Sequence, residues 1–94
     1  MAALADNIRD AIRDDRYVFG AHVDQRLRER RIMGWQVVSE MDAAKVIRER
    51  TDAMPNPAAE FDLVLPDGTS LKAVWSWIAR DRTAKLVTVH FYDR

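Results

Sequence analysis

Three basic residues, His22, Arg26 and Arg30, are spaced four positions apart within residues 17–32, YVFGAHVDQRLRERRI. Residues at i and i+4 are neighbours on one face of an α-helix, so a helix here would bring the three side chains together. A histidine exchanges its proton near neutral pH, and arginine guanidinium groups pair well with phosphate oxygens. The set therefore suits cleavage of a phosphodiester, docking of an acidic partner, or a solvated helix face without further role.

Metal-independent cleavage of RNA needs a base for the 2′-hydroxyl, cations beside the developing phosphorane, and an acid for the leaving oxygen. His22 is a candidate for the base or the acid in this reaction. Arg26 and Arg30 are candidate ligands for the scissile and adjacent phosphates, because guanidinium groups bind them bidentately. The alternative for His22 is a residue that faces water or hydrogen-bonds to the backbone.

A second set of candidates, Lys72, His90 and Tyr92, lies in the C-terminal half of the chain. If the last segment is a strand, His90 and Tyr92 share one of its faces with Thr88. Paired side chains on neighbouring antiparallel strands lie about 5 Å apart, so Lys72 reaches His90 if the register allows it. His90, Lys72 and Tyr92 are all candidates for the second proton-transfer group. We assign His90 to catalysis, and Lys72 and Tyr92 to substrate binding. The alternative for His90 is a half-exposed strand residue without a catalytic role.

Other residue patterns have structural explanations. Asp24 and Arg28 have the i,i+4 spacing of an ion pair on a solvated helix face. Tryptophan side chains can stack on nucleic-acid bases, but Trp75 and Trp77 fall on one strand face with Leu71 and are better explained as core. The acidic and histidine residues show no metal-ligand spacing, and neither a phosphate-binding glycine loop nor a nucleophile elbow occurs. We therefore expect no metal and no cofactor.

Composition indicates one small domain, residues 1–94, which can bury a single compact core. The chain has no cysteine, which excludes disulfides and thiolate metal sites and suits a reducing compartment. No run of signal-peptide or membrane-spanning length occurs, so we expect a cytoplasmic protein without a membrane partner. The formal net charge is zero, but residues 20–32 hold four arginines against two carboxylates. Nucleic-acid binding would therefore depend on a local patch.

The N-terminal half has the hydrophobic spacing of helices. We predict helices over residues 4–14, 20–30 and 35–42, joined by a short extended link at 16–19. In the second helix Val23 and Leu27 point inward at i and i+4. The third is expected to bury Trp35, Val38 and Met41.

The C-terminal half has the pattern of strands. A first strand is expected at 46–47, and FDLVL and LKAVWSWI flank a hairpin turn at Asp67-Gly68. LVTVHFY is the last strand, with Leu86 expected on the polar face beside Thr88 and His90. The fold class is thus α+β, with helices (about 4–42) covering one face of a four-stranded antiparallel sheet (about 45–92).

The segment YVFGAHVDQRLRERRI, the DG hairpin and the closing strand LVTVHF together resemble domain-of-unknown-function family 4258. These are small bacterial proteins similar to the RelE/ParE and BrnT-like toxins. The resemblance extends from about residue 7 to residue 92, and its sharpest motif is H-x-x-x-R-x-x-x-R followed by isoleucine. Matched to that motif, the histidine is His22 and the arginines are Arg26 and Arg30.

The chain departs from the family pattern at three positions. Gly20 stands where the family often has a serine, so a side-chain helix cap is lost. Lys72 stands where a histidine is common, and His90 stands where a tyrosine is common. Both replacements keep a polar side chain near the sheet, but the catalytic roles of the family residues at these positions do not carry over directly.

The resemblance implies a RelE/BrnT-like fold and a toxin-type, metal-independent endoribonuclease of a bacterial toxin–antitoxin pair. Its partners would be RNA or the ribosome and a cognate antitoxin protein. The alternative is a non-catalytic protein-interaction module, in which the arginine face binds an acidic partner and the sheet edge pairs with a peptide.

Overall fold

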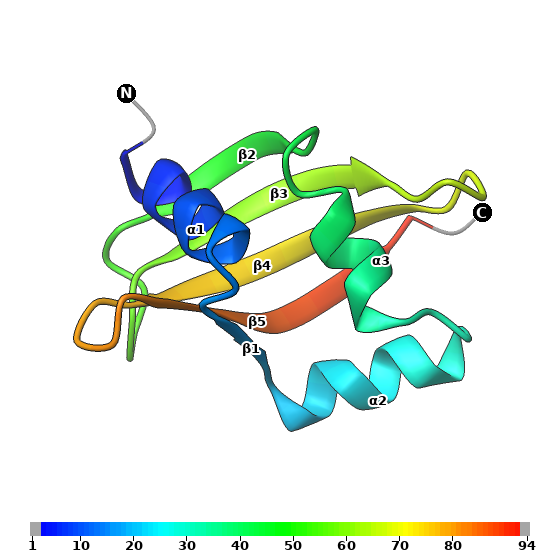
Figure 1. The fold of residues 1–94 in the computed structure, drawn as a ribbon, viewed down its shortest axis with the longest axis horizontal. Helices are drawn as coiled ribbons and strands as arrows, with labels where there is room; N and C mark the ends of the chain where they lie inside the picture. The colour runs from blue at the N-terminus through cyan, green and yellow to red at the C-terminus, as the bar shows by residue number, and fades with distance from the viewer. Residues whose placement is uncertain (1–2, 93–94) are drawn as a thin grey trace.

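The computed structural model describes residues 3–92, so the ends of the predicted domain 1–94 lie outside the described residues. The elements in chain order are α1 (Ala3–Arg13), β1 (Tyr17–Phe19), α2 (Ala21–Glu29), α3 (Gly34–Ser39), β2 (Lys45–Arg50), β3 (Ala58–Val64), β4 (Ser70–Ile78) and β5 (Thr83–Phe91). Figure 1 shows α1 and α3 crossing one face of the sheet, with α2 along its β5 side. The predicted α+β class and the helical N-terminal half are confirmed. Within residues 3–92, no helix is long and apolar enough to cross a membrane.

The predicted four-stranded antiparallel sheet is one strand short. The sheet has five strands in the order β1-β5-β4-β3-β2, and β1 runs parallel to β5 while the other pairs are antiparallel. The expected extended link is therefore β1, bracketed by two hydrogen bonds to β5. The Ala84 N–H donates to the Arg16 carbonyl at 3.1 Å, and the Gly20 N–H donates to the Leu86 carbonyl at 2.9 Å. Three residues are too few to show a strand period in the sequence.

The helices bury narrow apolar stripes against the sheet. In α1 the buried residues are Ala5, Ile8, Ala11 and Ile12. In α2 they are Val23 and Leu27, the two that the spacing predicted. The start of α1 is also tied to the sheet, because the Ala5 N–H donates to Glu49 Oε2 on β2 at 2.7 Å. A free N–H in the first helical turn is thus satisfied by a carboxylate, which also suits the helix dipole.

The third helix starts one residue earlier and ends three residues earlier than predicted, and it exposes one residue that was expected inside. Val37 and Met41 are fully buried, whereas Trp35 is 66% exposed. Gly34 lies against the Phe19 ring, where a Cβ atom would come within 2.2 Å of a ring carbon. With Val37 facing the core, Trp35 is turned about 200° away along the helix, toward solvent. The expected burial of Met41 is confirmed, and that of Trp35 is wrong.

A β-bulge shifts the phase of β5. Val74 pairs with Thr88 and Trp75 pairs with Leu86, so Val87 is an extra residue between the two pairs. Leu86 is consequently fully buried on the helix-covered face, and its expected place beside Thr88 and His90 is wrong. The bulge lets apolar residues on both sides of Val87 point into the same core; these are Ala84, Leu86, Val89 and Phe91.

Trp75 lies at the centre of that core. Its side chain is fully buried, and the rings of Tyr17 and Phe19 both lie 6.4 Å from its ring, centroid to centroid. We expect Trp75→Ala to lower the free energy of unfolding by about 3–5 kcal/mol, because it removes a large buried ring and leaves a cavity. Trp35→Ala is the matched control, with an expected change within about 0.5 kcal/mol. Equal losses for the two variants in chemical denaturation would contradict this account of the core.

Candidate functional site on the uncovered sheet face

Strand pairing places four polar residues in one line across the face of the sheet opposite the helices. Lys45 pairs with Asp62, Asp62 with Lys72, and Lys72 with His90. Paired residues share a face, and these four alternate with buried residues such as Phe61, so they lie on the uncovered side. The expected approach of Lys72 to His90 is confirmed by the register. We call Lys45, Asp62, Lys72 and His90 the charged row.

Tyr92 lies beside the charged row and is tied to it. Its backbone N–H donates to the Ser70 carbonyl at 3.1 Å, and its hydroxyl donates to Asp62 Oδ1 at 2.5 Å. The ring of His90 meets that of Tyr92 edge-on, with 5.7 Å between centroids. The hydrogen bond to Asp62, aided by partial burial and by the charges of Asp62 and Glu60, raises the pKa of Tyr92 to about 12. At neutral pH Tyr92 is therefore a neutral phenol that cannot act as a base.

Glu60 holds one of the two lysines of the row, Lys72, in place. Although it lies on the uncovered face, its side chain is only 8% exposed, because long cationic side chains flank it. Its Oε1 is 3.5 Å from Lys72 Nζ, and its Oε2 is 3.4 Å from an Arg50 guanidinium nitrogen. A buried carboxylate requires such partners, since an unpaired buried charge is costly. Glu60 thus restrains the ammonium of Lys72, the residue that pairs with His90.

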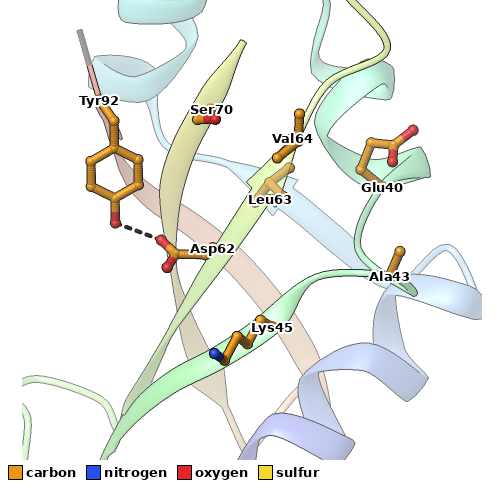
Figure 2. Close-up of a pocket in the computed structure, with 8 residues that line it drawn as sticks. All are labelled: Glu40, Ala43, Lys45, Asp62, Leu63, Val64, Ser70 and Tyr92. Carbon is orange, nitrogen blue, oxygen red and sulfur yellow. Dashed lines mark hydrogen bonds between the residues drawn. The ribbon is translucent and has the colours of Figure 1, made fainter. Parts of the chain in front are cut away.

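A cavity of about 440 Å³ adjoins the row where β2 begins. Figure 2 shows its lining, in which Asp62 stands between Tyr92 and Lys45 while Glu40 and Ala43 come from the segment after α3. The other lining residues are Leu63, Val64 and Ser70. Asp62 and Lys45 therefore belong to both the charged row and the cavity.

The residues predicted from the helical motif form a separate group on α2. His22 and Arg26 are exposed, and Gly20 caps the helix without a side-chain hydrogen bond, as expected. The predicted Asp24–Arg28 ion pair is present, with 2.7 Å between Arg28 Nη2 and Asp24 Oδ2. Across residues 3–92, no hydrogen bond, ion pair or ring contact joins His22 or Arg26 to the charged row.

Arg30 brings the end of this group close to β5. It is the C-cap of α2, and its guanidinium carbon lies 4.3 Å from the centroid of the Phe91 ring. Phe91 stands between His90 and Tyr92 in the chain but points to the opposite face of the sheet. The six predicted residues are thus divided between a helix group (His22, Arg26, Arg30) and a sheet group (Lys72, His90, Tyr92).

Several residues of the site were not predicted. Asp62 carried an incomplete signal, because counting outward from a two-residue Asp67-Gly68 turn brings it opposite Ala73, whereas the observed register pairs it with Lys72. Lys45, Glu40 and Ser70 carried none, since only the fold brings them to one cavity. Nothing in the sequence distinguished Glu60 from an ordinary strand residue whose side chain faces solvent.

The described part of the chain, residues 3–92, holds no group of three or more His, Asp and Glu residues that could bind a metal ion. Comparison with protein-family models, with curated proteins and with solved structures finds no match to this chain. The toxin-like relationship thus stays a prediction.

The Tyr92–Asp62 bond can be tested through the ionisation of the phenol. In an absorbance titration of tyrosinate, Tyr92 is expected to ionise with a pKa of about 12, and Tyr92→Phe identifies its signal. Asp62→Asn removes the negative charge, so Tyr92 should ionise at lower pH. Because the pKa of Tyr92 is raised on folding, the bond stabilises the fold below pH about 10 and loses this effect as the pH rises toward 12. An unchanged Tyr92 titration in Asp62→Asn would show that Asp62 is not the cause.

Proposed function

We propose that this protein is a metal-independent endoribonuclease of the toxin type, which binds RNA across the uncovered sheet face. The observation that carries the proposal is the charge of that face. Among residues 3–92 it holds five cations, Lys45, Arg48, Arg50, Lys72 and Lys85, against two carboxylates, Glu60 and Asp62. Five minus two is an excess of three positive charges on a chain whose formal net charge is zero. Such a surface attracts the phosphate backbone of a nucleic acid.

The charged row supplies groups for cleavage at its β5 end. In this reaction the 2′-oxygen of a ribose attacks phosphorus and the bond to the 5′-oxygen breaks, which gives a 2′,3′-cyclic phosphate and a 5′-hydroxyl. His90 would take the proton from the first oxygen or give one to the second, as histidine does in general acid–base catalysis. The Lys72 ammonium, held by Glu60, would stabilise the phosphorane charge. Tyr92, a neutral phenol, would bind substrate through its hydroxyl.

The helix group supplies a second set of phosphate ligands. The Arg30 guanidinium stacks on Phe91, whose side chain faces the helix-covered side of the sheet, so the end of α2 contacts β5 on the face opposite His90. Arg26 and Arg30 would bind phosphates of the RNA beyond the scissile one. His22 is the other candidate for the proton-transfer residue, and the experiment below compares it directly with His90.

A toxin of this kind would act in the bacterial cytoplasm and be neutralised by a cognate antitoxin. The zero net charge disfavours tight binding of free RNA, because phosphate neutralisation dominates such affinity. A ribosome-dependent enzyme would not need tight binding of free RNA, because the ribosome itself positions the RNA. The RNA on the ribosome is therefore the substrate we propose first.

The second candidate function is a non-catalytic protein-interaction module. The free outer edge of β2 favours it, since β2 ends the sheet within the described residues. A peptide strand from a partner can add to such an edge through main-chain hydrogen bonds.

The proposal is tested by inducing the chain in bacterial cells and mapping RNA ends during growth. Wild type is expected to arrest growth and to generate new 5′-hydroxyl ends. His90→Ala should lower the cleavage rate about 10²–10⁴-fold, the usual effect of losing a general acid or base. His22→Ala is examined in parallel, and Arg26→Ala is paired with Arg28→Ala, an exposed cation of the same helix.

Each outcome assigns a role. A loss confined to His90→Ala places proton transfer on the sheet, whereas a loss confined to His22→Ala places it on the helix. Normal growth and intact RNA from well-folded wild type would reject the ribonuclease and leave the interaction module.

A further inference from the structure

The cavity beside the charged row is rich in hydrogen-bond acceptors. Glu40 and Asp62 contribute carboxylates and Ser70 a hydroxyl, and Lys45 is the cation of the lining. Tyr92 donates its hydroxyl to Asp62 Oδ1, which fixes that carboxylate and leaves Oδ2 as a further acceptor. The apolar side chains of Ala43, Leu63 and Val64 complete the lining, and Figure 2 shows Tyr92 and Asp62 on one side of β3 and Glu40 on the other.

The backbone of β3 adds an acceptor and a donor to this cavity. Pairing of β2 with β3 ends at Lys45 and Asp62, so the β3 edge beyond Asp62 has no strand partner within residues 3–92. The Leu65 N–H donates to the Thr69 carbonyl across the β4 side of the hairpin. Because successive residues of a strand direct their peptide groups to opposite sides, the N–H and C=O of Val64 point to the free edge. Val64 therefore offers an unpaired peptide group to a ligand.

We propose that this cavity holds one base of the RNA and prefers guanine. The inference rests on the proposed function, since it names the substrate group bound next to the reaction site. The size is suitable, because sites for small ligands have volumes of roughly 300–1,000 Å³. A base read in a pocket is recognised by hydrogen bonds to its Watson–Crick edge.

The preference follows from the excess of acceptors. Guanine carries an N–H and an amino group side by side on that edge, and one carboxylate can accept from both. Its adjacent carbonyl oxygen can accept from the Lys45 ammonium or from the Val64 N–H. Adenine and cytosine each place an acceptor nitrogen beside the amino group, and uracil flanks one N–H with two carbonyls. Opposite Glu40 or Asp62 these acceptors meet negative charge, which disfavours the three other bases.

The location of the cavity also fits a nucleotide. Asp62 and His90 are separated by two strand spacings, roughly 10 Å, with Lys72 between them. A base held at Asp62 would leave its ribose and phosphate over Lys72 and His90. The same carboxylate would thereby set both the base identity and the position of the backbone.

The test measures binding of free mononucleotides, so it does not depend on cleavage. The isotope-labelled protein is titrated with guanosine, adenosine, cytidine and uridine 5′-monophosphates and followed by amide NMR shifts. Guanosine monophosphate is expected to bind at least about fivefold tighter than the others, the lower end for one bidentate base contact. Its shifts should centre on Val64 and Ser70. Asp62→Asn should abolish the preference, and Asp52→Asn, an exposed turn residue outside the cavity, should keep it.

The outcomes separate the two proposals. Equal binding of the four nucleotides, or shifts centred elsewhere, would overturn the base pocket even if the chain cleaves RNA. Guanine-selective binding at Val64 in a protein that leaves RNA intact would support the pocket and reject the ribonuclease.

Discussion

The pairing of β4 with β5 determines both faces of this sheet at once. On the helix-covered side it sets Trp75 against Leu86, and on the other side it sets Lys72 against His90. Both pairings can occur in one strand only because Val87 forms a β-bulge between them. Without the extra residue, a β5 that kept Leu86 in the core would turn His90 inward and expose Phe91, because a shift of one residue exchanges the faces of a strand. The apolar core and the charged row therefore depend on the same local irregularity.

The uncovered face gathers positive charge without leaving its carboxylates unpaired. Glu60 is nearly buried between Arg50 and Lys72, and Asp62 accepts the hydroxyl of Tyr92. Each carboxylate restrains a group that we assign to substrate, so stability and function are coupled at these positions. Substitution of Glu60 would release Lys72 and also leave the charge of its neighbours uncompensated. Such coupling is a reason to prefer isosteric amide substitutions when the two effects are to be separated.

Much of the fold follows from sequence patterns, whereas the site follows from contacts that patterns do not encode. The apolar stripes of α1 and α2, the Asp67-Gly68 hairpin and the Asp24–Arg28 pair all arise from residues close in sequence. Strand β1 is too short to show a period, and it exists because β5 offers it a partner. Trp35 was expected inside together with Val38 and Met41, but the burial of Val37 turns it outward. The cavity joins the segment after α3 to three strands and Tyr92, so only the tertiary structure reveals it.

The helix group and the sheet group can serve one substrate although they lie on different elements. The charged row crosses β2, β3, β4 and β5 in order, and α2 packs along β5 beyond it. Arg30 on Phe91 marks the point where this helix meets the strand that carries His90. A single RNA strand that follows the row from the cavity would have to pass around the edge of β5 to reach the arginines of α2. Because the chain has no net charge, the gathering of cations on the uncovered face of the sheet is how it would attract a polyanion.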